Sequence, residues 1–124
     1  MDNAPIVIVD DDIDDREFLK NAWKELGLPH PLIFFINGEQ VLQYLTTEKT
    51  KPFLILSDVN LPKMNGFELK KKLMEHDDTY YKSIPFIFWS TSASEAQIKK
   101  SYDLAGHGFF IKENNFEDLK QSLM

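Results

Sequence analysis

The sequence contains no cysteine, which excludes both a disulfide framework and a thiolate metal site. Its longest apolar runs, such as Leu32–Ile36 and Pro85–Trp89, are far too short to span a bilayer, so we expect no membrane insertion. Residues 1–5 carry no basic region and no secretory apolar core, and we therefore expect the protein in the cytoplasm. Basic residues are in the minority, with 14 Lys and Arg against 20 Asp and Glu. This balance argues against nucleic acid as a direct partner, because phosphate backbones select basic faces.

The composition is that of one compact domain. The chain has 124 residues, of which 43% are apolar and 13% aromatic. This length suffices for a buried core and is too short for two domains of ordinary size.

Short apolar runs alternate with helical patterns along the chain. The runs predict strands over Pro5–Val9, Leu32–Ile36, Phe53–Ser57, Pro85–Trp89 and Phe109–Ile111. Helices are expected over residues 14–26, from residue 38 onward, and over residues 67–76, 94–105 and 116–124, with a loop over residues 58–66. Strands without polar alternation are typical of a parallel sheet buried on both faces. The repeated strand–helix order therefore predicts a doubly wound α/β fold.

Two of the predicted strands end in aspartate. The first runs into Asp10, Asp11 and Asp12, and the third runs into Asp58. Ligands of such sheets bind beyond the carboxyl ends of the strands. Crowded carboxylates repel one another unless a cation or protons neutralise them. We therefore predict a Mg²⁺ site formed by Asp10, Asp11 and Asp58.

The rest of the acidic block has simpler explanations. Asp12, Asp14 and Asp15 can cap the start of the following helix and complement its dipole. A calcium-binding EF-hand loop starting at Asp10 is rejected, because its sixth position is Asp15 instead of Gly and its twelfth is Asn21 instead of Glu.

Two further strand ends carry groups that suit phosphoryl chemistry. A carboxylate can attack phosphorus and form an aspartyl phosphate, given a cation and fixed donors for the phosphoryl oxygens. The fourth strand is followed by Ser90, Thr91 and Ser92, and the fifth by Lys112. Together with Asp58, these strand ends predict a phosphorylation pocket.

Four separated motifs resemble the response regulator receiver domain, which histidine kinases phosphorylate. They are Ile8–Asp12, Leu56–Gly66, Ser90–Ser92 and Phe109–Lys112, and the resemblance covers essentially the whole chain. It implies a flavodoxin-like, five-stranded parallel sheet of strand order 2-1-3-4-5. It also implies a single receiver domain over residues 1–124 with no output domain.

The resemblance implies a division of labour among the oxygen ligands. Asp58 would accept the phosphoryl group from a sensor histidine kinase or a histidine phosphotransfer protein. Asp11 and Asp58 would bind Mg²⁺ through their carboxylates, Asp10 would help through water, and Asn60 would contribute its backbone carbonyl.

The resemblance also implies a switch. Lys112 would pair with Asp58 and then with the phosphoryl group, while Ser90 would hydrogen-bond a phosphoryl oxygen. Thr91 is the alternative hydroxyl if the strand register differs by one residue. Phe109 occupies the aromatic position whose rotation would expose or cover a surface for a downstream protein partner. That surface would comprise the helix over residues 94–105, the strand over residues 109–111 and the helix over residues 116–124.

One departure from the family pattern keeps an alternative open. Glu113 follows Lys112 where the family usually has proline in a cis peptide, and a cis bond to another residue costs about 2.5–4 kcal/mol. A pseudo-receiver that binds partners without phosphorylation therefore remains an alternative. An aspartyl-phosphate phosphatase is a weaker one, because its second Asp is replaced by Asn60. We expect no enzyme acting on an external substrate, and a monomer or a weak phosphorylation-dependent dimer.

Overall fold

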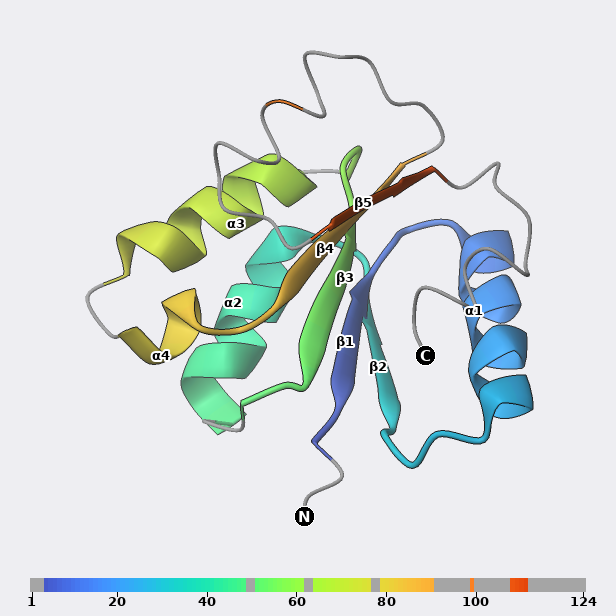
Figure 1. Ribbon diagram of the computed structural model, residues 1–124. Coiled ribbons are helices and arrows are strands. Elements are labelled where there is room, and N and C mark those ends of the chain that lie inside the picture. Colours follow the sequence, from blue (N-terminus) through green and yellow to red (C-terminus); the bar gives the residue numbers. More distant parts are fainter. Residues whose placement is uncertain are drawn as a thin grey trace.

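The predicted parallel sheet is confirmed. The computed structural model describes residues 4–48, 51–61, 64–76, 79–90, 99 and 108–111. Its elements are β1 (Ile6–Val9), α1 (Ile13–Leu26), β2 (Leu32–Phe35), α2 (Gly38–Glu48), β3 (Leu54–Asp58), α3 (Gly66–Glu75), α4 (Thr79–Lys82), β4 (Phe86–Ser90) and β5 (Gly108–Ile111). The five strands form one sheet of order β2-β1-β3-β4-β5 (Figure 1), and all four pairings are parallel.

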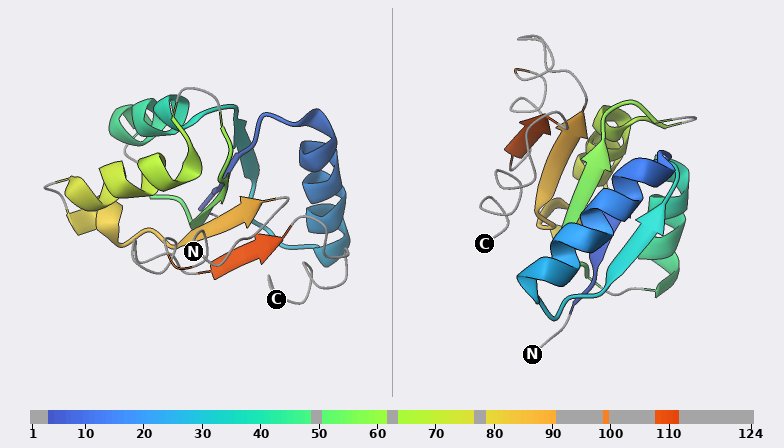
Figure 2. Two further views of the ribbon diagram at one scale, coloured as in Figure 1. Left: turned by 90° about the horizontal axis from the view of Figure 1, so that it is seen from above. Right: turned by 90° about the vertical axis from the view of Figure 1, so that its right-hand side faces the viewer.

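Helices cover both faces of this sheet. Figures 1 and 2 show α1 against one face and α2, α3 and α4 against the other. Successive side chains of a strand point to opposite faces. Accordingly, Val7 and Val9 of β1 join the core under α2 and α3, whereas Ile6 and Ile8 join the core under α1. Because both faces are buried, the strand sequences are apolar runs without polar alternation.

The central strand β3 is buried throughout and extends one residue beyond the predicted strand. Asp58, expected as the first residue of a loop, is the last residue of β3 and lies opposite Trp89 of β4. The ladder continues for one more bond, because the Val59 N–H donates to the Trp89 carbonyl at 3.1 Å. Asp58 is therefore held in the ladder with β4.

Helix α1 begins and ends at sequence-encoded caps. The Asp12 side chain accepts hydrogen bonds from the N–H groups of Asp14 at 2.8 Å and Asp15 at 3.2 Å, which confirms its role at the helix start. At the other end, Gly27 has a φ of 66°, in the left-handed region that glycine adopts at little cost.

Helix α3 begins at a capping box that the sequence analysis described only as a turn. The Asn65 side chain accepts from the Glu68 N–H, and the Glu68 side chain accepts from the Asn65 N–H. The short helix α4 was not predicted.

The carboxyl-terminal predictions are tested only in part. Of the helix expected over residues 94–105, only residue 99 is described, and it is helical. The helix expected over residues 116–124 lies outside the described residues. Among the described residues, no helix has the length and apolar character needed to cross a membrane.

Candidate functional site

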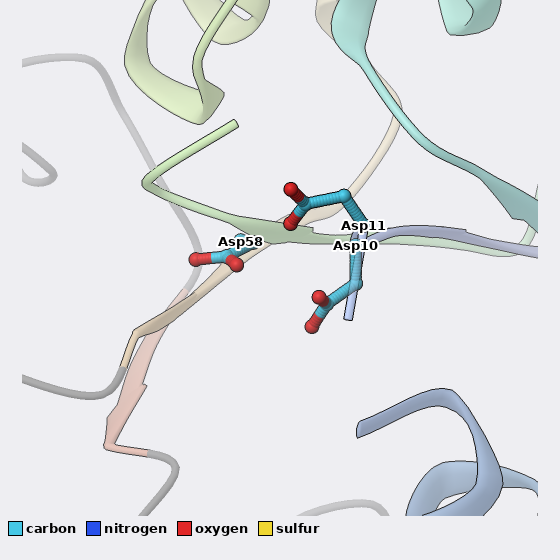
Figure 3. A group of neighbouring side chains, drawn as sticks. All are labelled: Asp10, Asp11 and Asp58. Carbon is cyan, nitrogen blue, oxygen red and sulfur yellow. The ribbon is translucent and has the colours of Figure 1, made fainter. Parts of the chain in front are cut away.

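The predicted cluster of carboxylates forms at the carboxyl ends of β1 and β3. These strands lie side by side, with Val9 opposite Ser57, so that Asp10 and Asp58 follow at equivalent positions. Asp10, Asp11 and Asp58 each offer one carboxylate oxygen, and these oxygens lie within 4.8 Å of one another (Figure 3). The parallel register therefore converts two separate sequence motifs into one site.

Backbone groups fix the two buried carboxylates. One oxygen of Asp10 accepts the N–H of Asp12 at 2.9 Å, and one oxygen of Asp58 accepts the N–H of Asn60 at 3.1 Å. In each case the donor lies two residues further along the chain, which is the Asx-turn arrangement. The loops after β1 and β3 thus orient the side chains that precede them.

Arg16 of α1 ties its helix to the end of β1, a role that the sequence analysis missed. Its Nε donates to the Asp10 carbonyl at 2.9 Å, and its guanidinium lies 5.9 Å from the centre of the Phe34 ring. An arginine four residues after an N-cap is ordinary on a helix, so no sequence signal marked it. Arg16 therefore supports the backbone from which Asp10 and Asp11 project.

The backbone of Asp58 leaves no room for a side chain at position 66. A Cβ on Gly66 would lie 2.4 Å from the Asp58 carbonyl oxygen and 3.1 Å from the Ser57 Oγ. The Gly66 N–H also donates to the Val59 carbonyl at 3.0 Å. The start of α3 therefore packs directly on the backbone of Asp58.

The charge of the site favours a cation. Asp10 and Asp58 are only 2% and 7% exposed, whereas Asp11 is exposed. At an effective dielectric constant of about 20, two like charges 4.8 Å apart repel each other by about 3.5 kcal/mol. A hard divalent cation relieves this repulsion, and carboxylate oxygens are the ligands that Mg²⁺ prefers. The donor set therefore fits the predicted ion.

The other predicted site residues are described in part. Asn60 lies in the loop directly after β3, and its N–H contacts Asp58. Ser90 is the last residue of β4 and follows Trp89, the register partner of Asp58. Phe109 lies in β5 opposite Phe88. The backbone of Phe109 lies on the predicted fifth strand, whereas Ser90 extends β4 one residue beyond the strand predicted over Pro85–Trp89. The side chains of both residues lie outside what the structure describes.

Three residues named for the predicted pocket, Thr91, Ser92 and Lys112, are not among those described. Glu113, which follows Lys112, is not described either. The roles assigned to Lys112 and to the alternative hydroxyl of Thr91 therefore stay predictions, as does the geometry of the Lys112–Glu113 peptide.

Comparison with known proteins identifies one family. A family model described as the response regulator receiver domain matches residues 6–124. Response regulator Rcp1 of Synechocystis sp. is 29% identical over 119 residues, which cover 92% of this chain and 80% of that protein. The structure of the Mn(2+)-bound form of Rcp1 matches with a TM-score of 0.83 at 29% identity, and the phosphorylated cyanobacterial phytochrome response regulator RcpA matches with 0.83 at 30%. Both structural matches cover 97% of this chain and 88% of the other.

Proposed function

The chain belongs to the response regulator receiver domain family, and we propose that Asp58 is its phosphoacceptor in a Mg²⁺-dependent reaction. One observation carries this proposal: Asp58 ends the central strand within 4.8 Å of the carboxylates of Asp10 and Asp11. The phosphorylated form of RcpA, a structure with 30% identity, supports the assignment.

We propose that Mg²⁺ is held by Asp11 and Asp58 directly, by Asp10 through water, and by the backbone carbonyl of Asn60. The oxygen-only donor set and the Mn(2+)-bound form of Rcp1 support a hard divalent cation at this place. When bound, the ion supplies positive charge that neutralises both the carboxylates and an incoming phosphoryl group. The hydrogen bonds from the following loops fix the orientation of the Asp10 and Asp58 carboxylates, which would hold the ion.

The proposed reaction is self-directed phosphoryl transfer. A carboxylate oxygen of Asp58 attacks the phosphorus of a phosphohistidine donor, on a histidine kinase or a histidine phosphotransfer protein. The new P–O bond forms as the donor's P–N bond breaks, and the released electron pair stays on the imidazole nitrogen, which takes a proton from solvent. Water later hydrolyses the aspartyl phosphate, so no external substrate turns over.

In this proposal, donors for the phosphoryl oxygens come from residues at or directly after the carboxyl ends of β4 and β5. Ser90 supplies a hydroxyl at the end of β4, beside the strand that carries Asp58. Lys112 directly follows β5 in the sequence and supplies a cation, with Thr91 as the alternative hydroxyl. Fixed donors of this kind stabilise the charge that develops on phosphoryl oxygens.

The signal then passes to protein partners. We propose that phosphorylation repositions Phe109 and changes the surface formed by the segments over residues 94–105, 109–111 and 116–124. We further propose that residues 1–124 act as one receiver unit in the cytoplasm, beside the kinase. The net charge of −6 supports a protein rather than a nucleic acid as the direct partner.

Acetyl phosphate provides the test, with phosphorylation followed by intact mass. We expect the wild-type chain to gain one phosphoryl group when Mg²⁺ is present and none after chelation, and Asp58→Asn to gain none. Asp12→Asn is the matched control, because it removes a neighbouring charge yet keeps the cap of α1, and it should be phosphorylated normally.

Two outcomes would contradict the proposal. Wild-type protein that binds Mg²⁺ but takes up no phosphoryl group would indicate a pseudo-receiver. Rapid turnover of added phosphomonoesters would indicate a phosphatase.

A further inference from the structure

Strand β2 lies at one margin of the sheet, with α1 and α2 on its two sides (Figure 2), and it is paired only with β1 in the described sheet. The carbonyls of Pro31 and Phe35 accept hydrogen bonds from the N–H groups of Ile6 at 2.8 Å and Asp10 at 2.9 Å. Backbone groups of successive strand residues alternate in direction. The N–H and C=O groups of Leu32 and Phe34 therefore point outward, away from β1.

This edge carries little of the protection that exposed edge strands normally have. Charged residues, bulges and prolines usually keep such edges from pairing with another chain. From Pro29 to Gly38 the sequence contains no charged residue, and Ile36 is 43% exposed. Only the two ends of the strand have features that hinder pairing with another chain. Pro31 precedes the strand, and the Gln40 side chain accepts a hydrogen bond from the outward N–H of Ile36 at 2.9 Å.

We propose that β2 pairs antiparallel with β2 of a second copy of this chain, which would join two sheets into one. The outward groups select the register. Leu32 lies opposite Phe34 of the second copy, Ile33 lies opposite its own counterpart on the two-fold axis, and Phe34 lies opposite Leu32. The register shifted to place Phe34 on the axis would need the N–H of Ile36, which Gln40 already occupies.

The side chains of the edge agree with this pairing. Leu32 and Phe34 are half-buried and pack on the α1 side of the sheet, so they meet across the two strands. Cross-strand pairs of aromatic and apolar side chains stabilise antiparallel strands. A two-fold interface of this kind is isologous, because the same patch is used by both copies.

Charge on α1 favours a second copy over an unrelated strand. Three charged residues of α1 line the groove beside β2 on this face: Glu17 near the start of the helix, Lys20, which contacts Glu17 of its own copy at 3.4 Å, and Lys24 near the end of the helix. Glu17 and Lys24 are about 10 Å apart along the helix axis. Because the two-fold axis reverses the direction of α1, it brings the Glu17 end of one copy toward the Lys24 end of the other.

The opposite face of the strand offers no repulsion. The groove between β2 and α2 is lined by uncharged residues, namely Phe34, Phe35, Gln40, Gln43, Tyr44 and Thr47. Antiparallel pairing also places the carboxyl ends of the two central β3 strands at opposite ends of the joined sheet. Both acidic sites therefore stay open, and the dimer forms without phosphorylation and without Mg²⁺.

Sedimentation velocity over a range of protein concentrations, with the metal chelated, tests the proposal. We expect a reversible monomer–dimer equilibrium for the wild-type chain. Leu32→Pro removes an outward N–H and no bond to β1, and it should abolish the dimer. Leu32→Ala is the matched control, because it keeps the N–H and should retain a weakened dimer. Circular dichroism checks that each variant is folded.

Charge reversal keeps the test decisive even if Leu32→Pro does not fold. Lys24→Glu places like charges opposite each other and should weaken dimerisation severalfold at low salt, and the double variant Glu17→Lys/Lys24→Glu should restore it. A wild-type chain that stays monomeric at every concentration would overturn the proposal. The edge of β2 would then be open for pairing with a strand of another protein. A double variant as weak as Lys24→Glu would overturn the two-fold register. Neither result bears on phosphorylation of Asp58.

Discussion

Replacing Gly66 with alanine should move Asp58, the proposed phosphoacceptor. The new Cβ would lie 2.4 Å from the Asp58 carbonyl oxygen, and about 3.0 Å is the closest approach that real Cβ atoms show. The backbones of α3 and β3 must therefore separate by at least the difference, 3.0 − 2.4 = 0.6 Å. Overpacking of this kind costs about 1–3 kcal/mol of stability. A displacement approaching 1 Å at a reacting group can lower a rate by about 100-fold.

Gly38→Ala provides the matched control. Gly38 and Gly66 are both the first residue of a helix, so the two substitutions change helix propensity alike. A Cβ on Gly38 would meet the flexible Met64 side chain at 3.0 Å and the Leu69 Cβ at 3.2 Å, and its nearest neighbours include no strand backbone. We expect the rate of phosphorylation by acetyl phosphate, measured by intact mass, to fall at least tenfold for Gly66→Ala and to change little for Gly38→Ala. Equal rates for both variants and wild type would refute the reasoning from backbone contact.

Three further predictions concern the metal, the helix cap and a buried lysine. Asp11→Asn should weaken Mg²⁺ binding at least tenfold by titration calorimetry with little change in thermal stability, because Asp11 is exposed. Asp12→Ala should lower the free energy of unfolding by about 1 kcal/mol in urea, because α1 loses its cap. Lys70 is 1% exposed, and burial lowers its pKa, so the folded chain releases this proton at lower pH than the unfolded chain. The free energy of unfolding should therefore rise as the pH increases from the lowered pKa of Lys70 to the ordinary lysine pKa of 10.5. The Lys70→Met variant should not show this rise.

Much of the fold could be predicted because the strands have clear sequence patterns. The apolar runs that became β1 and β3 are short, free of polar alternation, and ended by aspartate, so both the buried sheet and the acidic edge could be predicted. The order of the strands came from the resemblance to a family and not from the pattern itself. The sequence also distinguished Asp12 as a helix cap from Asp10 and Asp11 at the strand end, and the Asp12 side chain accepts the N–H groups of Asp14 and Asp15.

What could not be predicted depends on contacts between distant segments or on very short elements. The bond from Arg16 to the Asp10 carbonyl arises only once α1 packs back on the sheet. Helix α4 has four residues, too few to show a helical period in sequence. The capping box of Asn65 and Glu68 could have been predicted, because the two residues have the required spacing. The Asn65-Gly66 pair, however, indicated only a turn.

In the proposed function, Asp58 itself carries the phosphoryl group. Borohydride reduction converts an aspartyl phosphate to an alcohol, and peptide mass spectrometry then locates the modified residue. After treatment with acetyl phosphate and Mg²⁺, we predict the reduced side chain in the peptide that contains Asp58, at that residue alone. Reduction at Asp10 or Asp11, or no reduced peptide from a chain whose intact mass shows added phosphate, would contradict the account.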